Sequence, residues 1–379
     1  MILTEKHVIK KSNKKFKELD DLCFLSKNLY NSALYSIRQS YFETKEYTNY
    51  YAVVSKFTKE NQIDYRSLPS KVSQQALKMV DQNFKSFFAC LKSKNVERAK
   101  IPKYLEKDGR FVVTYTNQAI SKKMLKEGVI KLSGSSVEIK TKVKDVRQVR
   151  IVPRKEYIVV EVLYETTDVE KLSDNGRYCS IDLGINNLAT VGSNVIKPII
   201  INGRPIKSIN QYYNKMLSKG KKRNVKRNFK VDDYLHKASK YLVNHLVSND
   251  IPILVIGYNK GWKQDINIGK VNNQKFVQIP HSKFIDMIKY KCDKVGINVI
   301  IAEESYTSKC SFKDSEDLKF HKTYLGKRVK RGLFENSDRS LINADLNGAL
   351  NILRKVVGNF DYDPIEVCST PLATAIKQN

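Results

Sequence analysis

Acidic residues follow two apolar runs and open a third pattern in the C-terminal half of the chain. Asp182 closes a strand-like run, Glu303 and Glu304 directly follow another, and Asp345 lies at the start of a helical pattern. Because such ends can meet above one edge of a sheet, we expect these carboxylates to converge. Converging carboxylates need cations, and oxygen ligands without His or Cys favour Mg²⁺ or Mn²⁺ over zinc. The pattern predicts two-metal hydrolysis of phosphodiester bonds, in which one ion activates water and the other stabilises the leaving oxygen.

Each of these acids also has a structural interpretation. Asp182 could close a β-turn, because Asp-x-Gly is a common turn sequence. Asp345 could be a first-turn acid behind an Asn343 cap, where the helix dipole favours negative charge. Glu303 and Glu304 could be solvent-facing acids at the start of a loop, in which case the metal site would lack a carboxylate and be inactive.

The charge of the chain predicts a polyanionic partner. Its 379 residues include 68 Lys and Arg against 39 Asp and Glu, a formal net charge of +29. That excess is far beyond what solubility requires. One stretch, residues 215–230, holds eight basic residues and no acid. A solvated helix face is the alternative interpretation of that stretch.

Cysteine usage and hydropathy predict a cytoplasmic protein. The six cysteines are scattered without a C-x-x-C pair, so neither a disulfide framework nor a zinc ribbon is indicated. The N-terminal residues lack the apolar core of a signal peptide, and no window approaches the ~20 apolar residues of a membrane span. We therefore expect no membrane partner, and the length allows two or three domains.

The N-terminal part of the chain changes its hydrophobic period twice. Residues 1–10 alternate like a strand, and apolar residues then recur every three to four positions from Val72 to Leu91. This spacing predicts an amphipathic helix with Ser70 as its N-cap. From about residue 100 to 168 the period falls to two, which is typical of strands. We expect a small, mostly antiparallel β domain with a helical stretch inserted after its first strand.

The C-terminal part alternates between strand and helix patterns. Three consecutive strands are followed by helix–strand repeats, which suggests one mixed α/β sheet. The expected strands cover 178–182, 187–192, 197–202, 252–257 and 297–302, and the expected helices cover 207–247, 281–294 and 343–356. A linker is expected at 171–177, and the chain after Gly358 loses its basic bias like a tail.

Three motifs in this part resemble the RuvC nuclease half of the TnpB family, transposon-encoded RNA-guided nucleases related to type V CRISPR effectors. Residues 182–190, DLGINNLAT, are similar to the first nuclease motif of the family. Residues 343–352, NADLNGALNI, are similar to its third motif, and YTSK at 306–309 adds to the match. The part before residue 170 resembles the family more loosely.

The resemblance implies a multidomain α+β fold. An N-terminal β-barrel-like domain with a helical insertion would be followed by an RNase H-like (RuvC) mixed α/β domain. The implied ranges are 1–10 and 96–170 for the wedge-like barrel, 11–95 for the helical recognition insertion, 177–304 and 341–357 for the RuvC domain, 305–340 for a degenerate zinc ribbon that binds target nucleic acid, and 358–379 for the tail.

Two departures from the family pattern affect the site. Most relatives carry a glutamate at the end of the strand 252–257, where this chain has Gly257. The resemblance implies that Glu304, with Glu303 as second choice, supplies this ligand from the next strand. The catalytic and metal-binding residues would then be Asp182, Glu304 and Asp345. Relatives also carry two C-x-x-C pairs after the YTS sequence, but residues 310–340 keep Cys310 and His321 alone, so zinc is not expected.

The resemblance also implies partners and a reaction. The protein would bind a guide RNA and cut both strands of a matching double-stranded DNA beside a short adjacent motif. The implied nucleic-acid-binding residues are Lys71, Gln75, Thr116 and Asn117, together with the basic residues Lys221, Lys222, Arg223, Arg227, Arg328 and Arg331.

Three other functions compete with this one. An RNA-guided DNA-binding protein that has lost cleavage is favoured by Gly257 and opposed by the intact Asp182 and Asp345. A sugar-kinase-like or actin-like ATPase would need a second Gly-rich phosphate loop that the sequence lacks. A DNA-joining transposase would share the metal chemistry. The sequence leaves the oligomeric state open.

Overall fold

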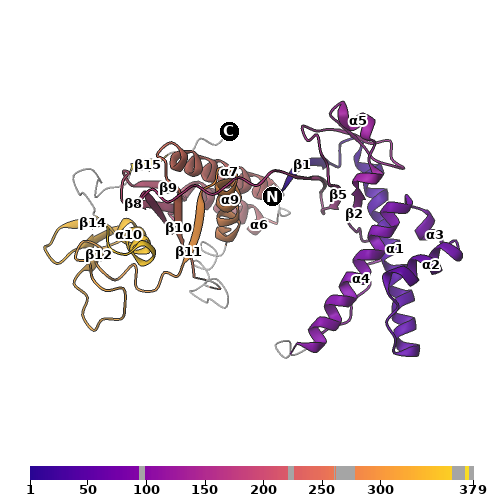
Figure 1. Ribbon diagram of the computed structural model, residues 1–379, viewed down its shortest axis with the longest axis horizontal. Helices are drawn as coiled ribbons and strands as arrows, with labels where there is room; N and C mark the ends of the chain where they lie inside the picture. Colours follow the sequence, from indigo (N-terminus) through magenta and orange to yellow (C-terminus); the bar gives the residue numbers. More distant parts are fainter. Residues whose placement is uncertain (94–98, 221–225, 260, 262–277, 361–371, 375–379) are drawn as a thin grey trace. The chain divides into compact units, whose positions relative to one another are not determined.

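The chain folds into two compact units, residues 1–167 and 168–379, each with its own hydrophobic core. The computed structural model describes residues 1–93, 99–220, 226–259, 261, 278–360 and 372–374 (Figure 1). The predicted change from β domain to mixed domain falls at this division, and the finer ranges within each unit stay predictions.

The first unit contains a four-stranded antiparallel sheet in the order β1-β6-β5-β2. Its strands are β1 (Ile2–Lys10), β2 (Val113–Thr116), β5 (Gln148–Pro153) and β6 (Tyr157–Glu165), and a separate pair is formed by β3 (Val129–Lys131) and β4 (Glu138–Lys140). Since β1 and β2 are the two ends of the order, the expected barrel-like closure is not shown by the pairing of the described residues.

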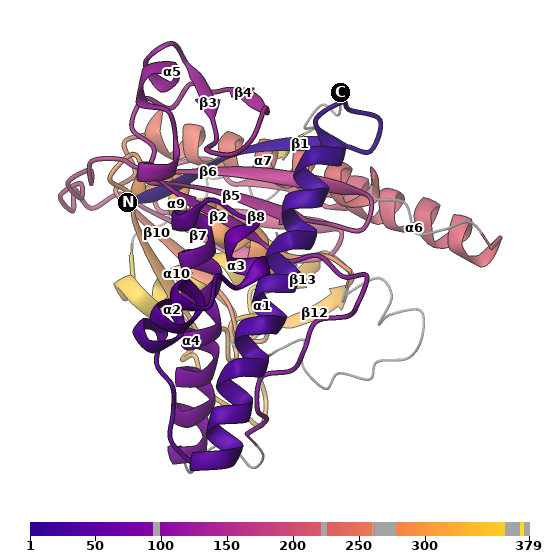
Figure 2. The same cartoon turned by 90° about the vertical axis from the view of Figure 1, so that its right-hand side faces the viewer.

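A group of helices lies between β1 and β2 in the sequence, as predicted. They are α1 (Phe16–Thr44), α2 (Tyr50–Lys59), α3 (Ile63–Arg66) and α4 (Ser70–Lys92), with a short α5 (Lys122–Lys126) after β2. The long helices α1 and α4 pack side by side (Figure 2). The predicted N-cap Ser70 is wrong by one residue. Pro69 is the cap, because its carbonyl already accepts the N–H groups of Val72 and Ser73.

The second unit is built on a mixed sheet in the order β11-β10-β7-β8-β9-β15. The strands are β7 (Tyr178–Leu183), β8 (Asn187–Ser193), β9 (Ile199–Asn202), β10 (Ile253–Gly257), β11 (Asn298–Ala302) and β15 (Leu372–Thr374). Strands β7, β8 and β9 are antiparallel, whereas β10 and β11 run parallel to β7. The predicted mixed sheet is confirmed. Three residues of the predicted tail join it as β15, which pairs in parallel with β9.

Helices cover both faces of this sheet (Figure 1). Successive side chains of a strand point to opposite faces. Leu254 and Ile256 of β10 therefore belong to the core formed with α7 (Lys226–Val247) and α9 (His281–Asp293), whereas Val255 packs with α10 (Ala344–Val357). The face that carries α10 is called the α10 face below.

The predicted helix 207–247 is wrong in its continuity. It is two helices, α6 (Arg204–Ser218) and α7, with residues 221–225 between them outside the described part. Gly220 has a φ of +71°, in the left-handed region, and such a residue ends a helix.

Residues 305–343 form a small extension after β11. Its strands are β12 (Lys327–Lys330), β13 (Leu333–Glu335) and β14 (Leu341–Asn343) in one antiparallel sheet.

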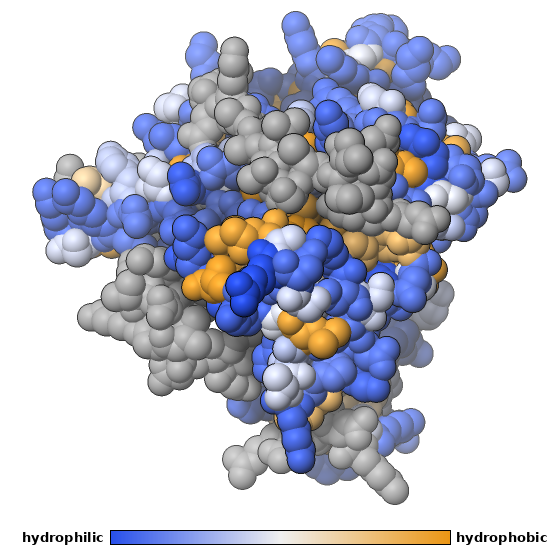
Figure 3. Space-filling model, turned by 90° about the vertical axis from the view of Figure 1, so that its left-hand side faces the viewer, coloured by the Kyte–Doolittle hydropathy of each residue, from blue (hydrophilic) through white to orange (hydrophobic). Residues whose placement is uncertain are grey.

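Among the described residues, no helix is both long enough and apolar enough to span a membrane. The face seen in Figure 3 exposes mostly hydrophilic residues.

Candidate active site

Asp182 lies on the α10 face near the end of β7. Its neighbours Ile181 and Leu183 point the other way, into the core with α7 and α9. Helix α10 comes very close here, because a Cβ added at Gly348 would lie 2.8 Å from Asp182 Oδ2. Gly348 therefore allows the helix backbone to approach the carboxylate.

Asp345 is held in the first turn of α10. The side chain of Asn343 caps the helix by accepting the N–H groups of Asp345 at 3.0 Å and Leu346 at 3.1 Å, which confirms the predicted cap. The Asp345 carboxylate accepts a hydrogen bond from Asn187 Nδ2 at 2.7 Å on Oδ2, and Arg328 Nη2 lies 3.1 Å from Oδ1. Both carboxylate oxygens thus have a nitrogen donor.

Glu304 occupies the space beside Gly257. The two strands pair Gly257 with Ala302, two residues before Glu304. A Cβ at Gly257 would lie 2.7 Å from Glu304 Oε1, 2.9 Å from Glu304 Cγ and 2.4 Å from Ile352 Cδ1. A side chain at position 257 and the observed Glu304 side chain therefore exclude each other.

Glu303 has a different environment. It is exposed, and its Oε2 lies 3.0 Å from Lys355 Nζ. Lys355 lies on the exposed side of α10, so Glu303 contacts the surface of that helix, whereas Glu304 lies half-buried beside Gly257. The geometry favours Glu304 over Glu303 as the partner of Asp182 and Asp345.

Burial and nearby negative charges raise the pKa of two of these carboxylates. Burial raises the pKa of Glu304 to about 7, and the charge of Glu303 adds to this. Burial, followed by the negative charges of Glu304 and Asp345, raises the pKa of Asp182 well above its usual value, against the opposing effect of Arg328. Glu304 Oε1 is buried and has no hydrogen-bond partner among the described residues. A cation would relieve both the repulsion and the unpaired oxygen.

The donor set suits a hard cation. All candidate ligands are carboxylate oxygens, which Mg²⁺ and Mn²⁺ prefer. No three His, Cys, Asp or Glu residues in the described ranges are close enough together to hold a metal ion as they stand. Asp345 is instead engaged by Asn187 and Arg328, so metal binding would require the Arg328 contact to change.

We expect the metal-free protein to lose stability as pH rises from about 4.5 to about 7. Glu304 has a folded-state pKa of about 7 against 4.5 in the unfolded chain. The folded state therefore binds more protons in this window, and the free energy of unfolding falls with rising pH. Thermal unfolding in EDTA measures the slope. Glu304→Gln should flatten it relative to the parent, and equal slopes would contradict the assignment.

The predicted adjacent-motif residues lie in the first unit. Lys71 is exposed and Gln75 half-buried near the start of α4, and Thr116 and Asn117 lie where β2 meets the 3₁₀ turn η1 (Asn117–Ala119). Helix α4 packs against both β2 and η1. The elements that carry these four residues are therefore neighbours, and their role in binding stays a prediction.

The predicted basic residues have varied environments. Lys221, Lys222 and Arg223 lie outside the described residues. Arg227 donates to Asn210 Oδ1 at 2.7 and 2.9 Å and to the Gln278 carbonyl at 3.0 Å, so its guanidinium ties α7 to α6. Arg331 is exposed between β12 and β13. Sequence reasoning missed the contacts of Asn187 and Arg328 with Asp345, which are 158 and 17 positions away, because the pattern around neither residue indicates this partner.

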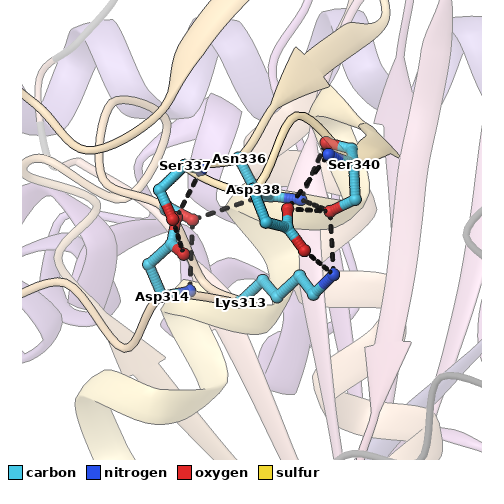
Figure 4. Close-up of polar contacts among 7 residues, drawn as sticks. Lys313, Asp314, Asn336, Ser337, Asp338 and Ser340 are labelled. Carbon is cyan, nitrogen blue, oxygen red and sulfur yellow. Dashed lines mark hydrogen bonds and ion pairs between the residues drawn. The ribbon is translucent and has the colours of Figure 1, made fainter.

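The segment after β11 is fixed by polar side chains. The buried Glu316 accepts the N–H groups of Ser311 and Leu325, each at 2.8 Å. The Cys310 thiol lies 3.3 Å from the Asp317 carbonyl. Further contacts join the two ends of the segment (Figure 4): Lys313 pairs with Asp338 at 2.6 Å, and Asp314 accepts hydrogen bonds from Ser337. The described contacts within this segment are thus hydrogen bonds and ion pairs between protein groups.

We therefore expect Glu316→Ala to lower the free energy of unfolding by about 1–3 kcal/mol, since the buried N–H group of Ser311 and the partly buried N–H group of Leu325 would lose their acceptor. A zinc chelator should leave the melting temperature of the parent unchanged. Glu303→Ala, which removes an exposed carboxylate, serves as the control in the same denaturant titration. A melting temperature that falls on zinc removal would contradict this account.

Comparisons with known proteins match the two segments that carry these residues. Residues 161–263 match the OrfB_IS605 family, described as a probable transposase. Residues 281–352 match the TNB domain of Cas12f1-like proteins. The first range contains Asp182, and the second contains Glu304 and Asp345. No curated protein matches the chain.

Solved structures resemble the chain at low sequence identity. A cryo-EM structure of a Cas12f1–sgRNA–target DNA complex matches with a TM-score of 0.51 and 13% identity, over 89% of this chain and 82% of that chain. A CRISPR-Cas12f ternary complex matches with the same identity and coverage at a TM-score of 0.35. The first match supports a shared multidomain fold. The two family matches, each over less than half of the chain, support a resemblance of these segments to TnpB-like proteins.

Proposed function

We propose that this protein is a transposon-encoded RNA-guided DNA endonuclease that cuts guide-matched DNA beside a short adjacent motif. One observation carries the proposal. The Glu304 side chain fills the space that a side chain at position 257 would need, on the face where Asp182 and the helix of Asp345 meet. We propose that Glu304, just after β11, supplies the carboxylate that the family pattern places at the end of β10.

The partners in this proposal are a guide RNA and double-stranded DNA. The solved relative at TM-score 0.51 is a complex with sgRNA and target DNA. The net charge of +29 supports binding of such polyanions. The mixed sheet of the second unit, with three antiparallel strands followed by two parallel ones, supports an RNase H-like nuclease domain.

In the proposed mechanism Asp182, Glu304 and Asp345 hold two Mg²⁺ or Mn²⁺ ions. When bound, the ions would activate water and stabilise the leaving oxygen of the phosphodiester. Glu304 and Asp182 would bind the ions in their deprotonated forms, because ligands bind metals deprotonated. Arg328, half-exposed beside Asp345, offers a guanidinium that can pair with a phosphate.

A guided DNA-binding protein without cleavage is the second candidate. The observation that favours it is the engagement of Asp345 by Arg328 and Asn187, with no assembled metal cluster among the described residues. In that case the protein would bind matched DNA and leave it intact.

Cleavage of guide-matched plasmid tests the proposal. The full chain would be purified with a co-expressed guide RNA and given DNA whose flanking sequence is randomised, with Mg²⁺ or with EDTA. We expect cutting that requires both the matching guide and the metal. Tight binding of matched DNA without cutting would favour the second candidate, and binding that ignores the guide would overturn both.

A further inference from the structure

We infer that Asn187 is a positioning residue of the proposed metal site, where its hydrogen bond orients the carboxylate of Asp345. The inference rests on the proposed function and deepens it. Asn187 is the first residue of β8, and its Nδ2 lies 2.7 Å from Asp345 Oδ2. The two residues are 158 positions apart in the chain, so the contact joins the sheet to the first turn of α10.

The turn before Asn187 is held rigidly. The buried His281 donates from Nε2 to the Gly184 carbonyl at 2.9 Å. The Gly203 N–H donates to the Asn186 carbonyl at 2.7 Å. A Cβ at Gly203 would lie only 2.4 Å from the Ile185 carbonyl oxygen, so the two backbone segments are in close contact. The Asn187 side chain therefore extends from a turn whose backbone is held by these contacts.

The two donors to Asp345 differ in their charge and in the element that carries them. Asn187 is neutral and belongs to the sheet. Arg328 is a cation on β12, and its side chain is 50% exposed. If Asp345 holds a metal ion, the charge of Arg328 beside it would no longer be needed, whereas the hydrogen bond from Asn187 would be kept. Asn187 would therefore fix the orientation of the Asp345 carboxylate, and with it the direction of Oδ1, the oxygen that Asn187 does not bind.

The expected effect follows from the usual cost of losing such a contact. Ligand carboxylates are oriented by hydrogen bonds from neighbouring residues, and removing one of these typically costs about 10–100-fold in metal affinity or activity. In Asn187→Ala the Asp345 carboxylate would lose its contact with the sheet and keep only the exposed Arg328, so metal binding would have to order the carboxylate. High metal concentrations should offset this loss.

Asn186→Ala is the matched control. It lies in the same turn, but its Oδ1 accepts from Lys207 Nζ at 2.5 Å. Mn²⁺ binding to the full chain without nucleic acid would be followed by the loss of the free-ion electron paramagnetic resonance signal, with Asp345→Ala as the blank. The Mg²⁺ concentration for half-maximal cleavage would be measured on the guide-loaded protein.

We expect Asn187→Ala to weaken Mn²⁺ binding and to raise the half-activating Mg²⁺ concentration by about 10–100-fold, with most of the rate recovered at saturating metal. Asn186→Ala should match the parent. Equal behaviour of Asn187→Ala and the parent would overturn the inference, and so would an equal loss in Asn186→Ala, which would point to the turn. If Asn187→Ala weakens Mn²⁺ binding but the parent cuts no matched DNA, the proposed function fails and the inference stands.

Discussion

Gly257→Ala is expected to lower cleavage by roughly 100-fold or more. The added methyl would lie 2.7 Å from Glu304 Oε1 and 2.4 Å from Ile352 Cδ1, so Glu304 must leave its position. A misplacement of about 1 Å at a catalytic group can cost about 100-fold in rate, and overpacking costs about 1–3 kcal/mol of stability. Single-turnover cleavage and denaturant unfolding measure the two effects.

A second glycine of the same sheet provides the control. The three atoms nearest to a Cβ at Gly192 are side-chain atoms of α10, at 3.2 to 3.4 Å, so Gly192→Ala should be milder in both assays. Gly257→Glu combined with Glu304→Ala would move the carboxylate to the neighbouring strand, and this double variant should cut better than Gly257→Glu alone. Normal cutting by Gly257→Ala would contradict the assignment of Glu304.

Asp182→Asn and Asp345→Asn are each expected to lower cleavage by about 1,000-fold or more. Metal ions contribute several kcal/mol to such reactions, and each 1.36 kcal/mol is tenfold in rate. Binding of guide RNA and matched DNA should persist, because it depends on other surfaces. The exposed Asp286 on α9 provides the control Asp286→Asn. More than a tenth of the parent rate in either site variant would contradict the proposed roles.

The sequence predicted the elements of the second unit closely and their contacts only in part. Apolar periodicity located β7, β8, β10 and β11 to within about one residue. For the inner strands β7, β8 and β10, burial on both faces leaves little freedom in composition, whereas β11 is an edge strand that is partly exposed. Helix 207–247 was predicted without its break, since Gly220 alone marks it.

The choice between Glu303 and Glu304 needed the structure. Both follow β11, which ends at Ala302, so sequence alone does not say which one continues the α10 face. The space beside Gly257 favours Glu304, and that space depends on the register in which β10 and β11 pair. The donors to Asp345 were out of reach for the same reason: Asn187 and Arg328 meet it through tertiary contacts.

The central claim is that Glu304 supplies the carboxylate that position 257 lacks. The most direct test compares Glu304→Gln with Glu303→Gln in Mg²⁺-dependent cleavage of guide-matched DNA, with binding of RNA and DNA measured in parallel. The account predicts that Glu304→Gln abolishes cutting and keeps binding, whereas Glu303→Gln, which loses only an exposed ion pair with Lys355, cuts like the parent. Loss of cutting in Glu303→Gln with normal cutting in Glu304→Gln would contradict it.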